Sequence, residues 1–199
     1  VIGENYRIES ALEGTPFGSV FAAVELASSR PVLLKRMRDE LHRSDKGLDL
    51  LLERARQVAA LKHRNLAELL AVFLEEERLH LVYERVEGRP VSDFLAESRA
   101  INLGAVKLVL SQTIKAVHHA HEKGLLHGDL TPAAIVVTAE GAVKVMDFAV
   151  AAEARKAAAK FSYGQMFGTP AYMAPEQELG ASFKESDFYS LGVILYEMA

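Results

Sequence analysis

Apolar and polar residues alternate through much of the N-terminal part of the chain, and a period of two predicts β-strands with one buried face. Short segments that contain glycine, proline or serine separate the alternating runs and are typical of turns. The pattern therefore predicts a sheet in this part of the chain. The expected strands are Tyr6–Ile8, Ser19–Leu26, Pro31–Met37, Leu66–Leu74 and Arg78–Tyr83.

A spacing of three to four residues replaces the alternation elsewhere and predicts amphipathic helices. One such helix interrupts the sheet-forming part, and its apolar positions are Leu48, Leu51, Leu52, Ala55, Val58, Ala59 and Leu61. After residue 90 the helical period dominates, with helices expected over 91–98, over 106–124 and from about Ser186. The second of these ends at Gly124, the residue type that most often terminates a helix.

The change of period falls near residues 87–90 and divides the chain into a sheet-rich part, 1–86, and a mainly helical part, 87–199. A run of strands followed by a run of helices is typical of α+β proteins. We therefore expect an α+β fold with two lobes.

Composition excludes several classes of protein. Half of the 199 residues are hydrophobic and a quarter are charged, as in a globular protein, and the formal charge of −4 gives no footprint for nucleic acid. No cysteine is present, which excludes a disulfide framework and fits a reducing compartment such as the cytoplasm. No apolar run is long enough to span a bilayer. Because the chain starts at Val1 and ends inside an apolar helical pattern, we expect it to be a piece of a longer chain.

Six short motifs follow one another along the chain. They are EGTPFGSV (13–20), VLLK (32–35), HGDLTPAAI (127–135), DFA (147–149), APE (174–176) and DFYSLG (187–192). In this order and spacing they resemble the signature set of protein kinases, and GTPAYMAPEQ (168–177) has the form found in serine/threonine kinases. The chain resembles a serine/threonine protein kinase domain from its first strand to the middle of the large lobe. The resemblance implies a bilobal fold, with an N-lobe at 1–86 and a partial C-lobe at 87–199.

The resemblance also implies ATP and Mg²⁺ as cofactors and three catalytic residues. Phosphoryl transfer depends mainly on positioning and on neutralising charge. Lys35 would bind the α- and β-phosphates of ATP, and Asp147 would be the metal ligand that holds Mg²⁺. Asp129 would accept or orient the proton of a substrate hydroxyl group.

Five further residues would contact the nucleotide by the same resemblance. Gly14 and Gly18 lie in the loop whose backbone approaches the phosphates, and Val20 would cover the adenine. Glu84 and Val86 lie in the hinge, where the backbone of Val86 would hydrogen-bond to the edge of the adenine.

The C-terminal motifs depart from the family pattern at four positions. Gly128 stands where the family has arginine, so a phosphorylated activation segment could not pair there. Thr131 replaces a lysine that neutralises the γ-phosphate, and Ala134 replaces an asparagine that supplies a second metal ligand. Ala149 replaces the glycine of DFG and removes its permissive backbone.

The N-terminal motifs are also altered. The helix position that should carry the glutamate partner of Lys35 holds Arg54, and Glu53 is one residue away. One residue along a helix is a rotation of about 100°, so Glu53 would not face the lysine and Arg54 would repel it. Further departures near the nucleotide are Glu13, Thr15, Leu33 and Tyr83.

Positions that serve the scaffold are kept. Val58, Leu69, His127 and Phe148 fall where kinases stack apolar and aromatic groups into a spine between the lobes. Asp187 stands where its carboxylate could hydrogen-bond to the backbone of the catalytic loop. Packing is thus retained while catalytic groups are lost, so we expect a pseudokinase that acts in signalling as a regulatory or protein-interaction module with a protein partner.

Other interpretations of these residues stay open. The chain could be an active serine/threonine kinase that uses Lys35, Asp129 and Asp147, or a small-molecule phosphotransferase, because HGDL also resembles aminoglycoside-type and choline-type kinases. A lone lysine at the end of a strand is often a solvated surface residue, and aspartates often cap turns. The histidines at 118, 119 and 121 resemble a zinc cluster, although position 119 points away from the other two.

The last helix is apolar on most sides, and we expect part of it to be bare. A partner, a second copy of the chain or further residues would then cover it, because each exposed apolar side chain costs about 1.5–3 kcal/mol. The residues concerned are Phe188, Leu191, Val193, Ile194, Leu195 and Tyr196.

Overall fold

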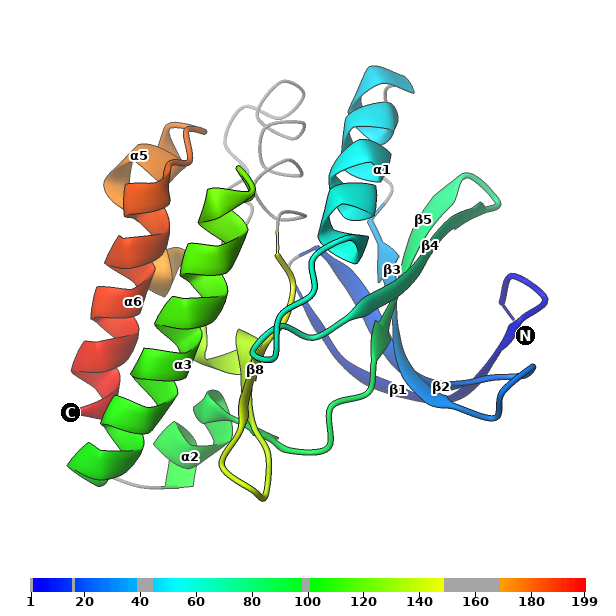
Figure 1. Ribbon diagram of the computed structural model, residues 1–199. Helices are drawn as coiled ribbons and strands as arrows, with labels where there is room; N and C mark the ends of the chain where they lie inside the picture. Colours follow the sequence, from blue (N-terminus) through cyan, green and yellow to red (C-terminus); the bar gives the residue numbers. More distant parts are fainter. Residues whose placement is uncertain (1, 16, 39–44, 98–100, 149–168) are drawn as a thin grey trace. The chain divides into compact units, whose positions relative to one another are not determined.

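The computed structural model describes residues 2–15, 17–38, 45–97, 101–148 and 169–199 (Figure 1). These residues form two compact units. The first unit contains the described residues up to 60 together with 68–85, and the second contains 61–67 and the described residues from 86 onward. The expected α+β architecture is thus present, with a sheet-rich unit and a mainly helical unit.

The first unit is built on an antiparallel sheet of five strands in the order β1-β2-β3-β5-β4. Its strands are β1 (Tyr6–Thr15), β2 (Gly18–Glu25), β3 (Pro31–Met37), β4 (Leu69–Glu75) and β5 (Arg78–Glu84). The five expected strands are confirmed, although β1 is longer than its alternating pattern. The strand expected from Leu66 begins only at Leu69, because Leu66 instead forms a bridge with Val145 in the second unit.

Successive side chains of a strand point to opposite faces of the sheet. One face carries a cluster of Tyr6, Ala23, Val32, Leu34 and Val82. Helix α1 (Asp45–Ala59) packs against β4 with its own buried residues, Leu51, Ala55 and Val58. The helical spacing seen in the sequence therefore marks a genuine buried stripe.

The second unit combines helices with a small antiparallel sheet in the order β6-β7-β8. Its strands are β6 (Arg89–Pro90), β7 (Ile135–Val137) and β8 (Val143–Val145). Its α-helices are α2 (Val91–Glu97), α3 (Leu103–Glu122), α5 (Pro175–Glu178) and α6 (Lys184–Met198). The described part of this unit also contains the 3₁₀ turns η2 (Pro132–Ala134) and η3 (Pro170–Tyr172).

The long helix α3 is specified at both ends by local chemistry. The Asn102 side chain accepts a hydrogen bond from the Gly104 N–H at 2.7 Å, which satisfies one of the free donors of the first turn. At the other end Gly124 adopts a φ of +73°, a conformation that glycine takes without steric cost. Between these ends α3 packs against β8 and α6.

Helix α6 is partly bare, as expected from its sequence, but two of the residues expected to be exposed are buried. Leu191 and Ile194 are buried, at 7% and 0% exposure, because α6 turns this side toward the interior of the unit. Phe188 and Tyr196 are exposed as expected, at 52% and 84%. Among the helices that the structure describes, none is both long and apolar enough to cross a membrane.

Candidate functional site

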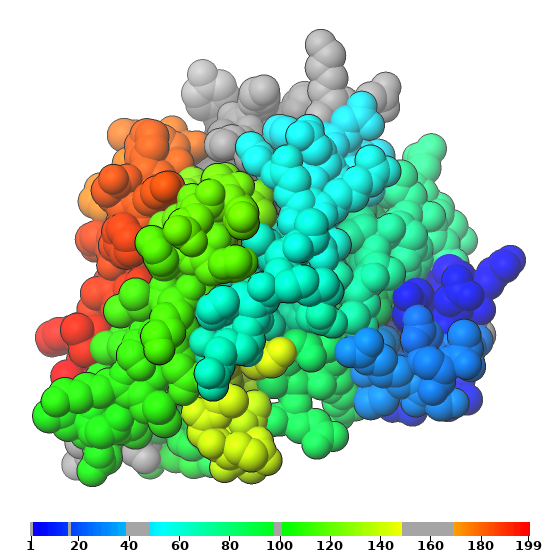
Figure 2. Space-filling model, viewed as in Figure 1, coloured from blue at the N-terminus to red at the C-terminus, as the bar shows by residue number. Residues whose placement is uncertain are grey.

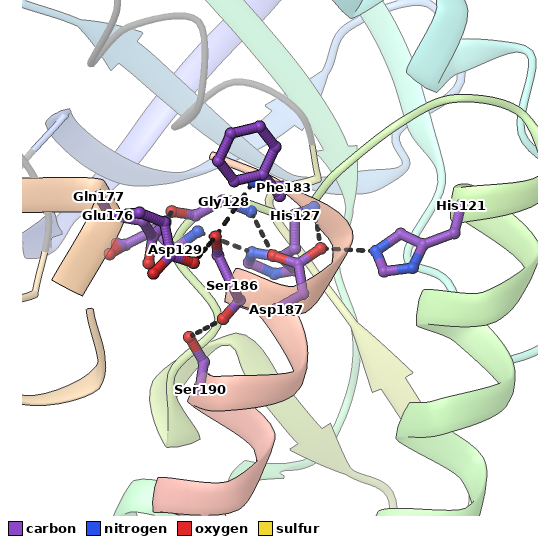
Figure 3. Close-up of polar contacts among 10 residues, drawn as sticks. All are labelled: His121, His127, Gly128, Asp129, Glu176, Gln177, Phe183, Ser186, Asp187 and Ser190. Atoms are coloured by element: carbon purple, nitrogen blue, oxygen red, sulfur yellow. Dashed lines mark hydrogen bonds and ion pairs between the residues drawn. The ribbon is translucent and has the colours of Figure 1, made fainter. Parts of the chain in front are cut away.

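The loop at 127–134 is held from below by Asp187 of α6 (Figure 3). The Asp187 carboxylate accepts hydrogen bonds from the backbone N–H groups of His127 and Gly128, each at 2.8 Å. This contact confirms the role expected for Asp187. His121 of α3 adds a third contact, since its Nε2 lies 2.7 Å from Asp187 Oδ2. Both side chains of this pair are almost fully buried.

The hydrogen bonds determine the ionisation of Asp187. Burial by itself would raise the pKa of this carboxyl group. The hydrogen bond from His121, the nearby His127 ring and the two backbone N–H groups oppose burial and lower the pKa below its ordinary value. Asp187 therefore stays an anion at neutral pH and continues to accept hydrogen bonds from the loop backbone.

Gly128 has a structural reason to be glycine. Its φ of +82° lies in the left-handed region, where an L-residue costs about 1–2 kcal/mol more than glycine. Its carbonyl oxygen accepts a hydrogen bond from Gln177 Nε2 of α5 at 2.8 Å. The replacement of the family's arginine thus relaxes the backbone here and removes a cationic side chain.

His127 is fully buried and joins the loop to the segment before Phe148. Its Nε2 lies 2.8 Å from the Met146 carbonyl oxygen, and its ring centroid lies 4.7 Å from that of Phe148. His127 and Phe148, the two residues of the expected spine that lie in the second unit, are therefore in contact. In the first unit Val58 and Leu69 are both buried.

Asp129, the candidate catalytic base, is hydrogen-bonded to the segment that contains the APE motif. Its Oδ1 accepts from the Thr169 N–H at 2.9 Å, and its Oδ2 accepts from the Thr169 hydroxyl group at 3.3 Å. The carboxylate is thus oriented by a residue forty positions away. Sequence reasoning missed this contact, as it missed those of His121 and Gln177.

Two of the altered positions lie just beyond Asp129. Thr131 and Ala134 are buried, at 9% and 6% exposure, and flank or form the turn η2. The backbone of Ala134 is used, since its carbonyl oxygen accepts from the Met146 N–H at 2.9 Å. Its methyl group has no atom that could bind a cation.

An open pocket of about 810 Å³ lies beside these residues within the second unit. Tyr172 and Glu197 are among its lining residues, and the tyrosine hydroxyl group donates to Glu197 Oε2 at 2.7 Å. Burial first, and then the contact with Glu197, raise the pKa of Tyr172. The lining residues are Ser92, Leu95, Ala96, Glu97, Thr131, Pro132, Ala133, Thr169, Tyr172 and Glu197.

Asp147, the candidate metal ligand, has a backbone conformation that is rare for its residue type. Its φ is +67°, whereas residues other than glycine mostly keep φ negative. Such conformations persist only where the surrounding structure imposes them, and they cluster at functional sites. Ala149, two residues later, lies outside the described residues.

In the first unit Lys35 is a buried residue of β3. Its exposure is 8%, and it lies between Val20 of β2 and Leu81 of β5 in the sheet register. Its Nζ is 5.7 Å from the centroid of the Tyr83 ring. The interpretation of Lys35 as a solvated surface residue is therefore wrong.

The two glycines of the expected phosphate loop are also explained by packing. A Cβ atom on Gly18 would overlap the carbonyl oxygen of Arg36 on the neighbouring strand. A Cβ atom on Gly14 would come within 3.2 Å of the Gly18 carbonyl oxygen, a tight contact. Glycine is needed at position 18 for the close approach of β2 and β3, whatever the loop binds.

Helix α1 presents Arg54, rather than Glu53, near its buried stripe. Arg54 is half-buried and its Nη1 donates to Gln57 Oε1 at 2.9 Å. Glu53 is exposed and accepts from Gln57 Nε2 at 3.3 Å. This orientation supports the prediction that Glu53 does not take the place of the glutamate that the family has at position 54.

The candidate hinge residue Glu84 has a structural role at the end of β5. Its carboxylate accepts from the Glu68 N–H at 3.0 Å, and its own N–H donates to the Glu68 carbonyl oxygen at 2.9 Å. Val86 follows in the second unit and is half-buried. Leu33, the substitution in the expected adenine roof, is half-buried and pairs with Tyr83.

The histidines of α3 do not form a zinc cluster. No group of three or more metal-binding side chains occurs within the described ranges. His121 faces Asp187, His118 lies 3.8 Å from Glu122, and His119 stacks on His63. The three side chains point in different directions from the helix, so they do not converge on one metal ion.

Comparison with known proteins places this arrangement in a family. Residues 8–199 match the protein kinase domain, and the chain belongs to that family. It is 33% identical over 198 residues to the serine/threonine-protein kinase PknA of Mycobacterium tuberculosis, covering 96% of the chain and 46% of that protein. It is 32% identical to the serine/threonine-protein kinase pkn3 of Myxococcus xanthus, covering 99% of the chain and 38% of that protein.

Solved structures agree on the fold. The PknI kinase domain of Mycobacterium tuberculosis superimposes with a TM-score of 0.78 at 21% identity, covering 98% of the chain and 72% of that structure. The chain spans less than half the length of these curated relatives. The chain therefore has the protein kinase fold and belongs to the protein kinase family, and these relatives are named as serine/threonine kinases.

Proposed function

We propose that this chain is a pseudokinase, a module that regulates or binds other proteins and transfers phosphate weakly or not at all. The observation that carries the proposal is the contrast at the catalytic loop. Asp187 still anchors the loop through His127 and Gly128, whereas Ala134 offers only a buried methyl group where the family has a metal ligand.

The free energies involved support a large loss of rate. Removing one preorganised group that stabilises charge costs about 3 kcal/mol, or two to three powers of ten in rate. Thr131 and Ala134 replace two such groups, and Arg54 replaces the acidic partner of Lys35. Such losses are not additive, but together they bring turnover close to background.

Each unit keeps one group of the kind that the family uses for ATP and Mg²⁺, whereas position 134 offers no ligand for a second metal ion. Lys35 supplies a buried cation for phosphate, and Asp147 supplies one carboxylate for Mg²⁺. Bound Mg²⁺ would neutralise charge on the phosphates. With alanine at position 134, this chain lacks the second ligand, so we expect nucleotide binding to depend little on the metal.

Titration with ATP, with and without Mg²⁺, tests the proposal. Calorimetry and thermal shift should show no binding, or weak binding that Mg²⁺ barely changes. Tight binding that requires Mg²⁺, together with autophosphorylation, would contradict it.

A cysteine-free sequence suits a cytoplasmic protein, and we propose that location for the module.

The second candidate is an active serine/threonine protein kinase. It is favoured by the buried Lys35 and by Asp129, whose carboxylate is already oriented by Thr169. It is also favoured by the kinase names of its relatives. Incorporation of labelled phosphate that Asp129→Asn abolishes would establish this candidate. The APE-containing segment bonded to Asp129 disfavours a small-molecule phosphotransferase.

A further inference from the structure

A short segment of the second unit, residues 61–67, lies along α3 and is held rigidly there. Asn65 Nδ2 donates to the Val143 carbonyl oxygen at 2.8 Å and to Gln112 Oε1 at 2.7 Å. The Asn65 carbonyl oxygen accepts in turn from the Val145 N–H at 2.8 Å. The two residues before Asn65, His63 and Arg64, are thereby presented at a fixed place beside the helix.

His63 stacks on His119 of α3. The two ring centroids are 5.0 Å apart and the rings are nearly parallel, at 22°. His63 Nδ1 accepts a hydrogen bond from the Asn65 N–H at 3.1 Å. In the neutral ring the hydrogen therefore resides on Nε2, the nitrogen turned away from that contact.

The charged groups around His63 are predominantly basic. Burial first, and then His119, Arg64 and Lys115, lower the pKa of His63. Lys62 precedes it in the segment, and Lys144 of β8 donates to the Leu66 carbonyl oxygen at 3.3 Å. The carboxylate on this part of α3 is Glu122, which lies 3.8 Å from His118.

We call the group His63, Arg64, Lys115 and His119 the His63 surface. Figure 2 views the molecule from this side and shows the segment after α1 lying against α3. Arg64 and Lys115 are exposed, and both histidines are half-buried. The His63 surface is thus a local concentration of positive charge on a chain whose formal charge is −4.

We propose that the His63 surface binds an acidic segment of a partner protein. The partner's carboxylates would lie against Arg64 and Lys115 and accept hydrogen bonds from the imidazoles. The proposal gives a partner chemistry to the interaction function above, but it does not depend on the loss of phosphotransfer. None of its residues belongs to the candidate catalytic site.

An acidic peptide suits this face better than a nucleic acid does. Leu108 is 45% exposed and lies seven residues before Lys115, two turns along the same face of α3. An apolar side chain beside the basic groups fits a peptide that mixes acidic and apolar residues. A long polyanion would also meet the net negative charge of the rest of the chain.

Binding should be coupled to protonation of His63. Burial and the neighbouring cations lower the pKa of His63 in the free protein, whereas a carboxylate placed beside its ring favours the charged form. The complex therefore takes up a proton. Affinity should increase as the pH falls through about 6.5, the ordinary value for an imidazole group.

Fluorescence anisotropy with a labelled peptide of alternating glutamate and leucine provides the test. The whole chain should bind this peptide and not the same peptide with lysine in place of glutamate. Lys115→Glu should weaken binding about tenfold, because it places like charges together. His63→Gln should reduce the dependence on pH.

Lys107→Glu is the matched control, since Lys107 is an exposed lysine of the same helix about 80° away from Lys115 around its axis. It should leave the affinity unchanged. Equal effects of the two charge reversals, or no effect of Lys115→Glu, would overturn the proposal. So would binding of a single-stranded DNA oligonucleotide in preference to the acidic peptide. Incorporation of labelled phosphate by the same variants reports on phosphotransfer separately.

Discussion

The loop at 127–134 has two parts that differ in how their polar groups are paired. We call His127 and Gly128, which Asp187 anchors, the base of the loop, and Thr131–Ala134 its tip. At the base the Asp187 carboxylate is buried and receives hydrogen bonds from two backbone N–H groups and from His121. At the tip Thr131 and Ala134 fill space with small side chains. Loss of a buried partner at the base would leave polar groups unpaired and destabilise folding. An absent metal ligand at the tip costs folding nothing, so the tip can change while the base is kept.

Breaking the base should have the largest effect. Asp187→Ala leaves His121 and two backbone N–H groups without their acceptor, and we expect a loss of about 3–5 kcal/mol in the free energy of unfolding. Urea denaturation followed by circular dichroism measures it. Glu185→Ala, in the same helix at an exposed position, should change stability by less than about 0.5 kcal/mol. Similar results for the two variants would show that Asp187 is not an anchor.

Rebuilding the tip should have the next largest effect, this time on rate. Thr131→Lys with Ala134→Asn restores two groups that the family uses, each worth about 3 kcal/mol of transition-state stabilisation at most. Incorporation of labelled phosphate in the presence of Mg²⁺ should rise above that of the natural chain. Ala133→Asn, which places the same amide on an exposed neighbour, should not raise it. A natural chain already as active as the rebuilt one would contradict the pseudokinase proposal.

The backbone conformation of Gly128 tests the anchored part of the loop in a second way. Gly128→Ala should lower the free energy of unfolding by about 1–2 kcal/mol, because its φ of +82° disfavours any Cβ atom. Gly192→Ala is the control with the opposite sign. Gly192 lies inside α6 with open space around it, so alanine there should be neutral or stabilising by up to about 1 kcal/mol. Thermal unfolding that moves in the same direction for both variants would refute this explanation.

The smallest effect is a pH dependence in the first unit, away from the loop. His80 is buried and its ring stacks on Phe73 at 5.1 Å. Burial is the main cause that lowers the pKa of His80 from 6.5. The folded chain therefore takes up this proton less readily than the unfolded chain. Its contribution to stability is complete above pH 6.5 and is lost as the pH falls below that value.

His80→Phe keeps the ring stack and removes the titrating group. The melting temperature of this variant should fall less between neutral and mildly acidic pH than that of the natural chain. His118→Gln, at an exposed position on α3, should retain the full dependence. An unchanged dependence in His80→Phe would assign it to other groups.

Local order in the sequence was enough for the elements and for part of the site. The period-two runs and the spacing of Leu51, Ala55 and Val58 predicted the strands and α1, because burial of one face imposes such patterns. The order of the motifs predicted the protein kinase family and the anchoring role of Asp187. The loss of a lysine at Thr131 and of an asparagine at Ala134 could also be predicted without a structure, because the residue type alone determines which atoms a side chain has.

Only the tertiary structure decided which distant side chains meet. His121 belonged to an apparent metal motif, yet it faces Asp187, sixty-six residues away. Thr169 orients Asp129 across forty residues. Residues 61–67 belong to the second unit although they follow α1, and in helix α6 the structure shows Ile194 buried and Tyr196 exposed. A local pattern records which face of an element is apolar, but long-range contacts depend on how helices and strands pack, and packing is a property of the whole fold.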